Sequence, residues 1–209
     1  LLKIPRAESG LSIGINAQAK EWAQVFFRDH HIADGDQVIG IAPCGGEAFG
    51  PQACIKRWPE EHFIELINAL MDNPAVKIFL CAGPAEQDEI DRIMSGLKHP
   101  ERCFSFTKIT LVQCVPLVDR CDLFIGNDTG LLRFADALKK KIVAFFGPVD
   151  ETVDGLFPYD PARHRYLSFN TPCRPCYRRF RLPICEMDRV CLKNISVESA
   201  LKAVEELNR

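Results

Sequence analysis

The chain has 209 residues, of which 47% are hydrophobic and 26% are charged, and its formal net charge is −2. Such a length fits one domain with attachments or two small domains, and such a composition is typical of a globular protein with a buried core. The small net charge gives no reason to expect a nucleic-acid-binding protein. No apolar run approaches the roughly 18 residues that a membrane-spanning helix requires.

The chain begins with LLKIP and lacks an initiating methionine, so we expect it to be a piece of a longer protein. Six of its ten cysteines are scattered through strand-like, helix-like and loop positions. This distribution is typical of thiols in a reducing compartment rather than of a disulfide framework. The sequence therefore predicts a cytoplasmic protein.

Helical and strand-like patterns alternate along most of the chain. An amphipathic helix is expected first, at residues 17–28, within a lead-in or linker of residues 1–36 at the junction with a preceding domain. Short apolar runs follow at residues 38–42, 76–82, 103–106, 123–125 and 142–146, with a sixth short strand at 164–168. Helical patterns separate them at residues 60–71, 85–97, 111–120 and 131–138. Strands buried on both faces read as continuous apolar runs, so this alternation predicts one doubly wound, Rossmann-like α/β domain with a parallel sheet over residues 37–209.

The end of this domain has a different composition. Residues 170–194 are rich in cysteine, arginine and proline and are expected to be irregular. A closing helix is expected at residues 197–207, with Ser196 as its N-cap.

The loop after the first strand combines flexible backbone with positive charge. Ligands of doubly wound sheets bind at the carboxyl ends of the strands, where loops meet helix N-termini. This loop contains Gly45-Gly46, which allows the backbone to approach a ligand closely, and it places Lys56 and Arg57 just before the next helix. One interpretation is an anion site, with phosphate as the ligand. The alternative is that both cations are solvated and that Trp58 is a packing anchor.

Two later loops carry polar side chains at strand ends. Glu86 follows the second strand, where it could accept hydrogen bonds from ribose hydroxyls or favour the N-terminus of the next helix. Asp128, Thr129 and Gly130 follow the fourth strand, and the backbone N–H groups of this turn, with the Thr129 hydroxyl, suit a diphosphate. Asp128 would be either the helix cap or a ligand of a sugar hydroxyl.

Two familiar nucleotide-binding motifs do not occur in the sequence. No G-x-G-x-x-G follows the first strand, and no G-x-x-x-x-G-K-[ST] is present anywhere. These absences argue against an NAD-dependent dehydrogenase and against a P-loop NTPase.

The chain resembles glycosyltransferase family 9 in the segments IKRWPEEHF, GPAEQDE, LFIGNDTGLLRFADAL and VAFFGPVDETVDGLFPYDPARHRYL and in its cysteine-rich tail. This family contains the heptosyltransferases that build the inner core of bacterial lipopolysaccharide. The resemblance runs in order from about residue 38 to residue 209 and depends on the combination of K-x-W-P with N-D-[ST]-G. It implies a GT-B glycosyltransferase, of which this chain is the C-terminal half, and a nucleotide-sugar donor, with ADP-heptose favoured.

The resemblance also implies a role for individual residues. Lys56, in the K-x-W-P motif, would contact the donor phosphate, and the turn Asp128-Thr129-Gly130 would hold the diphosphate and the sugar. Glu86 would hold the ribose, and the backbone near Ile109 would contact the nucleobase. Arg133 stands where the family usually has a histidine, and its guanidinium could bind phosphate in a bidentate manner.

The expected chemistry is inverting, metal-independent sugar transfer that requires no cofactor. The family's general base is an acidic residue of the N-terminal domain, so no catalytic residue is expected in this chain, which would bind the donor but not transfer the sugar alone. The expected partners are the nucleotide-sugar donor, the lipopolysaccharide core acceptor and, peripherally, the cytoplasmic face of the inner membrane, but no nucleic acid.

Four cysteines near the C-terminus have a spacing that allows a metal site, although free or oxidisable thiols are the favoured interpretation: Cys173, Cys176, Cys185 and Cys191. Five arginines make the same stretch basic, so it would face either an anionic lipid or acceptor, or solvent: Arg174, Arg178, Arg179, Arg181 and Arg189. Two alternative functions remain from the sequence. One is another GT-B nucleotide-sugar enzyme, such as an epimerase, and the other is a non-catalytic zinc-binding interaction module.

Overall fold

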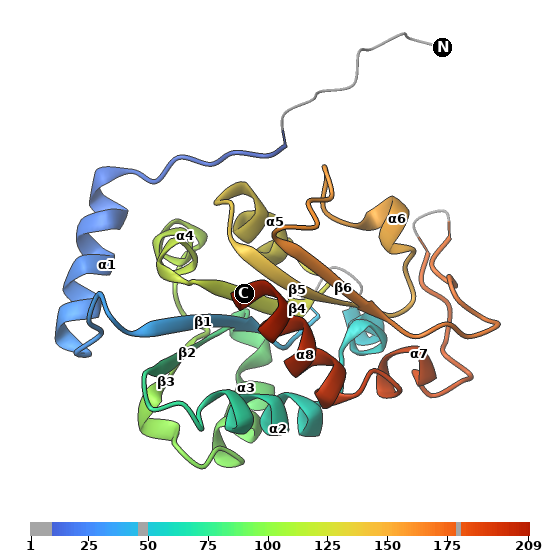
Figure 1. Ribbon diagram of the computed structural model, residues 1–209. Helices are drawn as coiled ribbons and strands as arrows, with labels where there is room; N and C mark the ends of the chain where they lie inside the picture. Colours follow the sequence, from blue (N-terminus) through green and yellow to red (C-terminus); the bar gives the residue numbers. More distant parts are fainter. Residues whose placement is uncertain (1–9, 46–49, 179–180) are drawn as a thin grey trace, which may run out of the picture.

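A sheet of six parallel strands forms the centre of the molecule (Figure 1). The computed structural model describes residues 10–45, 50–178 and 181–209. The strands are β1 (Gln37–Ala42), β2 (Val76–Cys81), β3 (Cys103–Phe106), β4 (Leu123–Asn127), β5 (Lys141–Phe146) and β6 (His164–Ser168). Their order is β3-β2-β1-β4-β5-β6, so the chain reverses its direction of travel across the sheet between β1 and β4. In a doubly wound sheet, this switch point opens a crevice at the carboxyl ends of the strands.

Helices cover both faces of the sheet (Figure 1). One face packs against α2 (Glu60–Leu70), α3 (Gln87–Ser95), α7 (Val190–Lys193) and α8 (Val197–Asn208). The other packs against α1 (Ala17–Asp29), α4 (Leu111–Arg120) and α5 (Gly130–Ala137). The remaining short helices are α6 (Glu151–Asp154) and three 3-10 helices, η1 (Gly50–Lys56), η2 (Pro84–Glu86) and η3 (Pro100–Arg102).

Trp58 anchors the core beneath α2. Its side chain is 1% exposed and stacks on Phe145 of β5, with 4.2 Å between ring centroids and 13° between planes. Its indole N–H donates a hydrogen bond to the carbonyl of Ile195, 2.9 Å away. The interpretation of Trp58 as a packing anchor is therefore confirmed, and the anchor holds the segment before α2 against the sheet.

The helix α1 belongs to the second core. Phe26 of α1 makes edge-to-face contacts with Phe79 of β2 and with Phe104 and Phe106 of β3. Asn16 caps the helix by accepting a hydrogen bond from the Ala19 N–H at 2.7 Å. The lead-in helix therefore covers the outer strands of the sheet.

The strands and long helices predicted from the sequence are confirmed, with ends that differ by one or two residues. The expectation that residues 170–194 are irregular throughout is wrong, because α7 lies within them and Arg178 and Arg181 form an antiparallel bridge. Ser196 caps α8 as expected, accepting a hydrogen bond from the Ser199 N–H at 3.1 Å. Gly46 and Arg179, which were named from the sequence, lie outside the described residues. Within the part of the chain that the structure describes, no helix is both long and apolar enough to cross a membrane.

Candidate functional site

A cavity of about 560 Å³ lies at the carboxyl ends of β1, β2 and β4, at the switch point of the sheet. Four residues that were named from the sequence line it together: Glu86, Ile109, Thr129 and Gly130. Much of the remaining lining is apolar and includes Leu111, Leu131 and Phe134. The lining therefore combines a helix N-terminus and a carboxylate with aliphatic and aromatic side chains. This is the composition expected of a site for a molecule with a flat ring and a charged end.

Asn127 fixes the turn between β4 and α5. It is fully buried, and its side-chain oxygen accepts a hydrogen bond from the backbone N–H of Trp58 at 2.9 Å. Its side-chain nitrogen donates to the carbonyl of Pro43 at 2.6 Å. Asn127 thus ties the end of β4 to the loop after β1, which positions both sides of the cavity. Asn127 was predicted only as the first residue of the N-D-[ST]-G motif, without a role of its own.

The two glycines around this turn have different roles. A Cβ on Gly126 would lie 2.7 Å from the carbonyl oxygen of Ala42, the residue that it pairs with in β1. Gly126 therefore lets two parallel strands approach closely. A Cβ on Gly130 would meet nothing within 4 Å, so the first residue of α5 faces open space. Only Gly130 leaves room for a ligand.

The N-terminus of α5 has polar groups without protein partners. Thr129 is the N-cap residue, but its side chain makes no capping hydrogen bond, and its hydroxyl oxygen is a buried atom without a hydrogen-bond partner. The first N–H groups of any helix lack intrahelical acceptors and carry a partial positive charge. An anion that reached this helix end would find both the hydroxyl and the backbone donors.

Asp128 does not cap α5. Its carboxylate pairs with the Lys56 ammonium at 2.7 Å and with the Arg133 guanidinium at 3.3 Å. The interpretation of Asp128 as a plain helix cap is therefore wrong, and so is that of Lys56 as a solvated cation, because Lys56 is only 9% exposed. The pair brings the K-x-W-P motif and the N-D-T-G turn together beside the cavity.

Arg133 is held by the backbone of the α6 segment. Its guanidinium donates a hydrogen bond to the carbonyl of Gly155 at 2.6 Å and another to the carbonyl of Asp154. The same group pairs with Asp128, so its donors serve the protein in the described structure. Asp150 supports this segment as the N-cap of α6, accepting a hydrogen bond from the Thr152 N–H at 2.9 Å.

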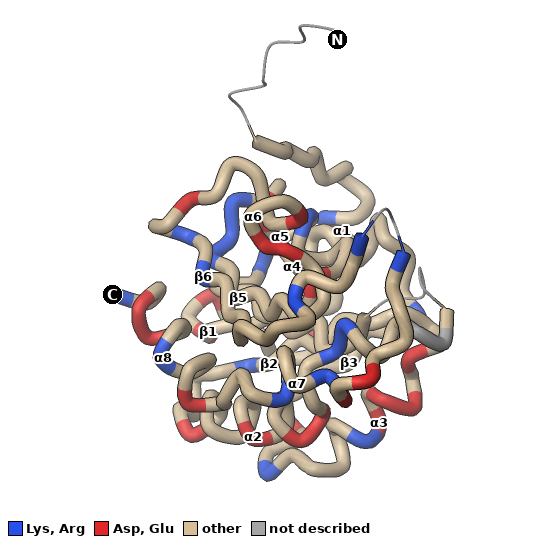
Figure 2. Tube along the Cα trace, turned by 90° about the vertical axis from the view of Figure 1, so that its right-hand side faces the viewer, with Lys and Arg blue, Asp and Glu red and all other residues tan. Residues whose placement is uncertain are grey.

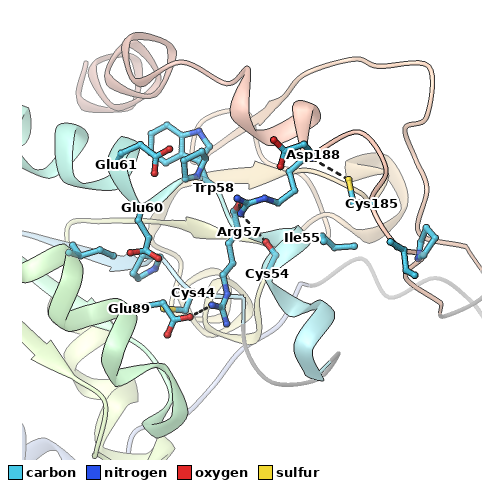
Figure 3. A pocket seen from close by; sticks show the side chains of 16 residues that line it. Cys44, Cys54, Ile55, Arg57, Trp58, Glu60, Glu61, Glu89, Cys185 and Asp188 are labelled. Carbon is cyan, nitrogen blue, oxygen red and sulfur yellow. Dashed lines mark hydrogen bonds and ion pairs between the residues drawn. The ribbon is translucent and has the colours of Figure 1, made fainter.

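Glu86 is buried at the entrance to α3 and closes the turn before it. One carboxylate oxygen accepts a hydrogen bond from the Gly83 N–H at 2.9 Å, and the other pairs with the Arg57 guanidinium at 3.3 Å. Arg57 also pairs with Glu89 (Figure 3). It therefore bridges two carboxylates. Arg57 was expected beside Lys56 at an anion site, whereas in the structure its guanidinium pairs with the carboxylates of Glu86 and Glu89.

A second cavity of about 700 Å³ opens on the α2 side of the same edge (Figure 3). Arg57, Trp58 and Glu89 line it, together with Cys185 and Arg189 of the cysteine-rich segment. Arg189 donates from its backbone N–H to the Cys185 sulfur at 3.2 Å, and its guanidinium donates to the carbonyls of Cys54 and Arg57. These contacts join the cysteine-rich segment to η1. Most of the charged side chains that line this cavity take part in ion pairs.

The four C-terminal cysteines are not arranged as a metal site. No group of three or more histidine, cysteine, aspartate or glutamate side chains converges to hold a metal within residues 10–45, 50–178 and 181–209. Burial, with a smaller effect of the neighbouring thiols, raises the pKa of Cys191 to about 11. Arg174 is bound to the carbonyls of Gly147 and Val149, so it is a structural residue. Figure 2 shows basic residues near β6 and α7 and acidic residues along α2 and α3.

A family model described as glycosyltransferase family 9 (heptosyltransferase) matches residues 3–182. Lipooligosaccharide heptosyltransferase 2 of Campylobacter jejuni is 28% identical over 183 residues, which cover 85% of this chain and 53% of that protein. The chain thus spans about half the length of the curated relatives it matches.

Two solved structures share the fold. That of Escherichia coli ADP-heptose lipopolysaccharide heptosyltransferase II matches with a TM-score of 0.72 and 22% identity, over 98% of this chain and 55% of that one. That of the E. coli heptosyltransferase WaaC, solved with ADP, matches with a TM-score of 0.62 and 19% identity, over 99% and 52%. The expected GT-B type of α/β fold is therefore confirmed.

Proposed function

The chain belongs to glycosyltransferase family 9, and from this premise we propose that it forms the donor-binding, C-terminal half of a heptosyltransferase of the lipopolysaccharide inner core. The observation that carries the proposal is that four residues with roles implied by the family line one cavity at the switch point of the sheet. The name of a structural neighbour solved with ADP supports an adenosine diphosphate donor, for which ADP-heptose is the proposed sugar nucleotide.

The proposed orientation of the donor follows from the polar and the apolar residues of the cavity lining. The base lies between Ile109, Leu111 and Phe134, where an apolar slot accepts a planar ring. The diphosphate lies at the N-terminus of α5, where the Thr129 hydroxyl and the first N–H groups of the helix are its donors. Glu86 lies at the ribose end, with both oxygens already ordered by Gly83 and Arg57.

Lys56 serves the leaving diphosphate in this arrangement. Its ammonium pairs with Asp128, the residue before the N-cap of α5, so its positive charge lies next to the proposed diphosphate position. When an acceptor hydroxyl attacks the anomeric carbon, negative charge accumulates on the departing diphosphate. Lys56 and the helix end would stabilise that charge in a partly buried site. The base that deprotonates the acceptor would come from the preceding half of the protein, and no metal is assigned a role.

The acceptor places the proposed reaction at a membrane surface. The donor is water-soluble, whereas the proposed lipopolysaccharide core acceptor is anchored by lipid, so they meet at the cytoplasmic face of the inner membrane. Vesicle flotation of the full-length protein, with and without acceptor, tests whether the protein makes peripheral contact there.

Calorimetric titration of the chain with ADP, UDP and GDP tests the donor site. We expect selective binding of ADP, lost in Lys56→Ala and in Thr129→Ala but kept in Lys202→Ala, which alters an exposed lysine of α8. Preference for UDP or GDP would overturn the adenosine donor but keep the site. If neither the chain nor the full-length protein binds a nucleotide, the proposed function is wrong.

A further inference from the structure

Three cysteines line the cavity proposed for the donor: Cys44, Cys81 and Cys114. They come from the loop after β1, from the last residue of β2 and from α4. The proposed donor contacts, which use a carboxylate, a hydroxyl, helix N–H groups and an apolar slot, do not require a thiol at any of these positions.

Cys81 and Cys114 line this cavity and also belong to the same hydrophobic core. Phe79 and Cys81 point to the α4 side of the sheet, where both pack in the same core as Cys114. The side chains of Cys81 and Cys114 interact directly, which raises the pKa of Cys81 and lowers that of Cys114. Of the two residues, Cys114 is the more exposed, at 7% against 2% for Cys81.

Two other cysteines, Cys44 and Cys121, are not part of this thiol pair. Burial raises the pKa of Cys44 to about 12, and Glu86 adds to the effect. Cys121 packs in the same core, but its thiol donates to the carbonyl of Leu117 at 3.2 Å, and it does not line the cavity. A small reagent that enters the cavity therefore meets Cys114, backed by Cys81.

We propose that Cys81 and Cys114 are a redox-sensitive thiol pair that forms a reversible disulfide when a peroxide enters the cavity, and that this bond weakens nucleotide binding. The effect on binding rests on the proposed function, whereas the formation of the disulfide does not. The chemical class of the oxidant is a hydroperoxide, and that of the reductant is a dithiol.

The reaction balances in two steps. The Cys114 thiolate attacks one peroxide oxygen, the O–O bond breaks, and the hydroxide that leaves takes up the thiol proton to form water. The Cys81 sulfur then attacks the sulfur of the resulting sulfenic acid. The S–S bond forms, the S–O bond breaks, and the second hydroxide leaves as water with the Cys81 proton. Two thiols are oxidised, and the hydroperoxide is reduced: hydrogen peroxide gives two waters, and an organic hydroperoxide gives an alcohol and one water. A dithiol reverses the change by exchange.

A bond between these residues would reshape the apolar wall. Ile109 and Leu111 line the cavity just before Cys114, and Leu111 is 62% exposed at the start of α4. A covalent bond draws the two sulfurs closer than non-bonded contact allows, so the first turns of α4 move toward β2. The slot proposed for the base becomes narrower, and affinity for ADP falls.

Peptide mass spectrometry of the chain after titration with hydrogen peroxide tests the thiol chemistry. We expect a peptide pair linked through Cys81 and Cys114 to appear at lower peroxide than any other linkage, and to disappear after dithiothreitol. Cys114→Ser and Cys81→Ser should each abolish it, whereas Cys54→Ser, which removes an exposed thiol outside this cavity, should not. Circular dichroism checks that each variant is folded. If a serine variant does not fold, the alanine variant at the same position replaces it.

Calorimetry with ADP tests the consequence for binding. The ratio of oxidised to reduced dissociation constants should be about tenfold or more in the unmodified chain and in Cys54→Ser, and close to one in Cys114→Ser. Absence of the linked peptide in the folded chain overturns the proposal. If the linked peptide forms but the dissociation constant of ADP is unchanged, the proposed effect of the disulfide on nucleotide binding is overturned. If the reduced chain and the reduced full-length protein bind no ADP, the proposed function fails, and the linked peptide still decides the thiol chemistry.

Discussion

The ammonium of Lys56 and the carboxylate of Asp128 lie 2.7 Å apart at the carboxyl edge of the sheet, with side chains only 10% and 12% exposed. This ion pair joins the loop after β1 to the loop after β4, the two strands that flank the switch point. It holds a cation beside the N-terminus of α5 before any ligand arrives. A site in which the charged group is already oriented loses less entropy on binding than one that must be assembled.

Lys56→Ala should weaken both folding and nucleotide binding. The substitution leaves the mostly buried Asp128 carboxylate with Arg133 as its charged partner, which we expect to lower the free energy of unfolding by about 1–3 kcal/mol. Loss of a charge-assisted bond to phosphate should raise the dissociation constant of ADP about 10- to 100-fold. Urea denaturation and calorimetry measure the two effects, with Lys202→Ala as the control. An unchanged affinity for ADP would remove Lys56 from the donor site.

Gly126→Ala and Gly130→Ala should have different effects on the free energy of unfolding. A Cβ at position 126 meets the Ala42 carbonyl at 2.7 Å, so β1 and β4 must separate, and we expect a loss of about 1–3 kcal/mol in the free energy of unfolding. A Cβ at position 130 meets only open space and a helix gains from alanine, so stability should stay equal or rise by up to about 1 kcal/mol.

Nucleotide binding separates these two variants further. Because Gly130 lines the cavity, its new methyl group should lower the affinity for ADP even though the protein is no less stable. Urea denaturation and calorimetry on the same preparations provide both readouts. A Gly130→Ala variant with unchanged affinity would argue that no ligand approaches the N-terminus of α5.

Trp58→Ala should be among the most destabilising single changes in the chain. It removes a side chain that is 1% exposed, its stacking on Phe145 and its hydrogen bond to Ile195. Truncation of a buried tryptophan to alanine costs about 3–5 kcal/mol. Trp58→Phe should cost less, because it keeps part of the aromatic contact, and Trp22→Ala, on the partly buried face of α1, serves as the control. Thermal unfolding ranks the three variants, and equal losses in Trp58→Ala and Trp22→Ala would contradict the anchor role.

The buried pair of Asp136 and His164 should make stability depend on acidic pH. His164 Nδ1 accepts a hydrogen bond from the Asp160 N–H at 3.1 Å, so Nε2 carries the proton and donates to Asp136, also at 3.1 Å. Burial acts to raise the pKa of Asp136, but the His164 hydrogen bond and the Arg163 charge bring it below its usual value of 3.8. The ionised form is therefore favoured in the folded state. Its contribution is fully present above pH 3.8 and is lost as the pH falls below that value.

Asp136→Asn tests this dependence. The variant should be less stable than the unmodified chain by about 1–3 kcal/mol at pH 7, because a charge-assisted hydrogen bond becomes a neutral one. The difference should begin to shrink below pH 3.8, where the carboxylate of the unfolded chain takes up a proton, and should be lost below the lowered pKa of the folded state. Urea denaturation at pH 7, 5 and 3 measures it, with the exposed Asp34→Asn as the control. A difference that stays constant over this range would mean that the charge of Asp136 does not contribute.

The strands β1, β2, β4 and β5 could be predicted almost to the residue because each is a short apolar run, and burial on both faces leaves that pattern in the local sequence. The strand ends also indicated where the cavity would form. By contrast, α7 and the 3-10 helices η1 and η2 are too short to leave a periodic signal, and contacts with the rest of the fold determine them.

The sequence by itself determined the fold class, the family and the positions of the polar turns, because periodicity and motif order are properties of the chain. Only the tertiary structure decided how those turns are used. Asp128 pairs with Lys56 instead of capping α5, Arg133 binds the α6 segment, and Arg57 orders Glu86. The physical reason is that a buried charge takes the nearest opposite charge in space, and the strand order, which local pattern does not encode, sets which charges are near.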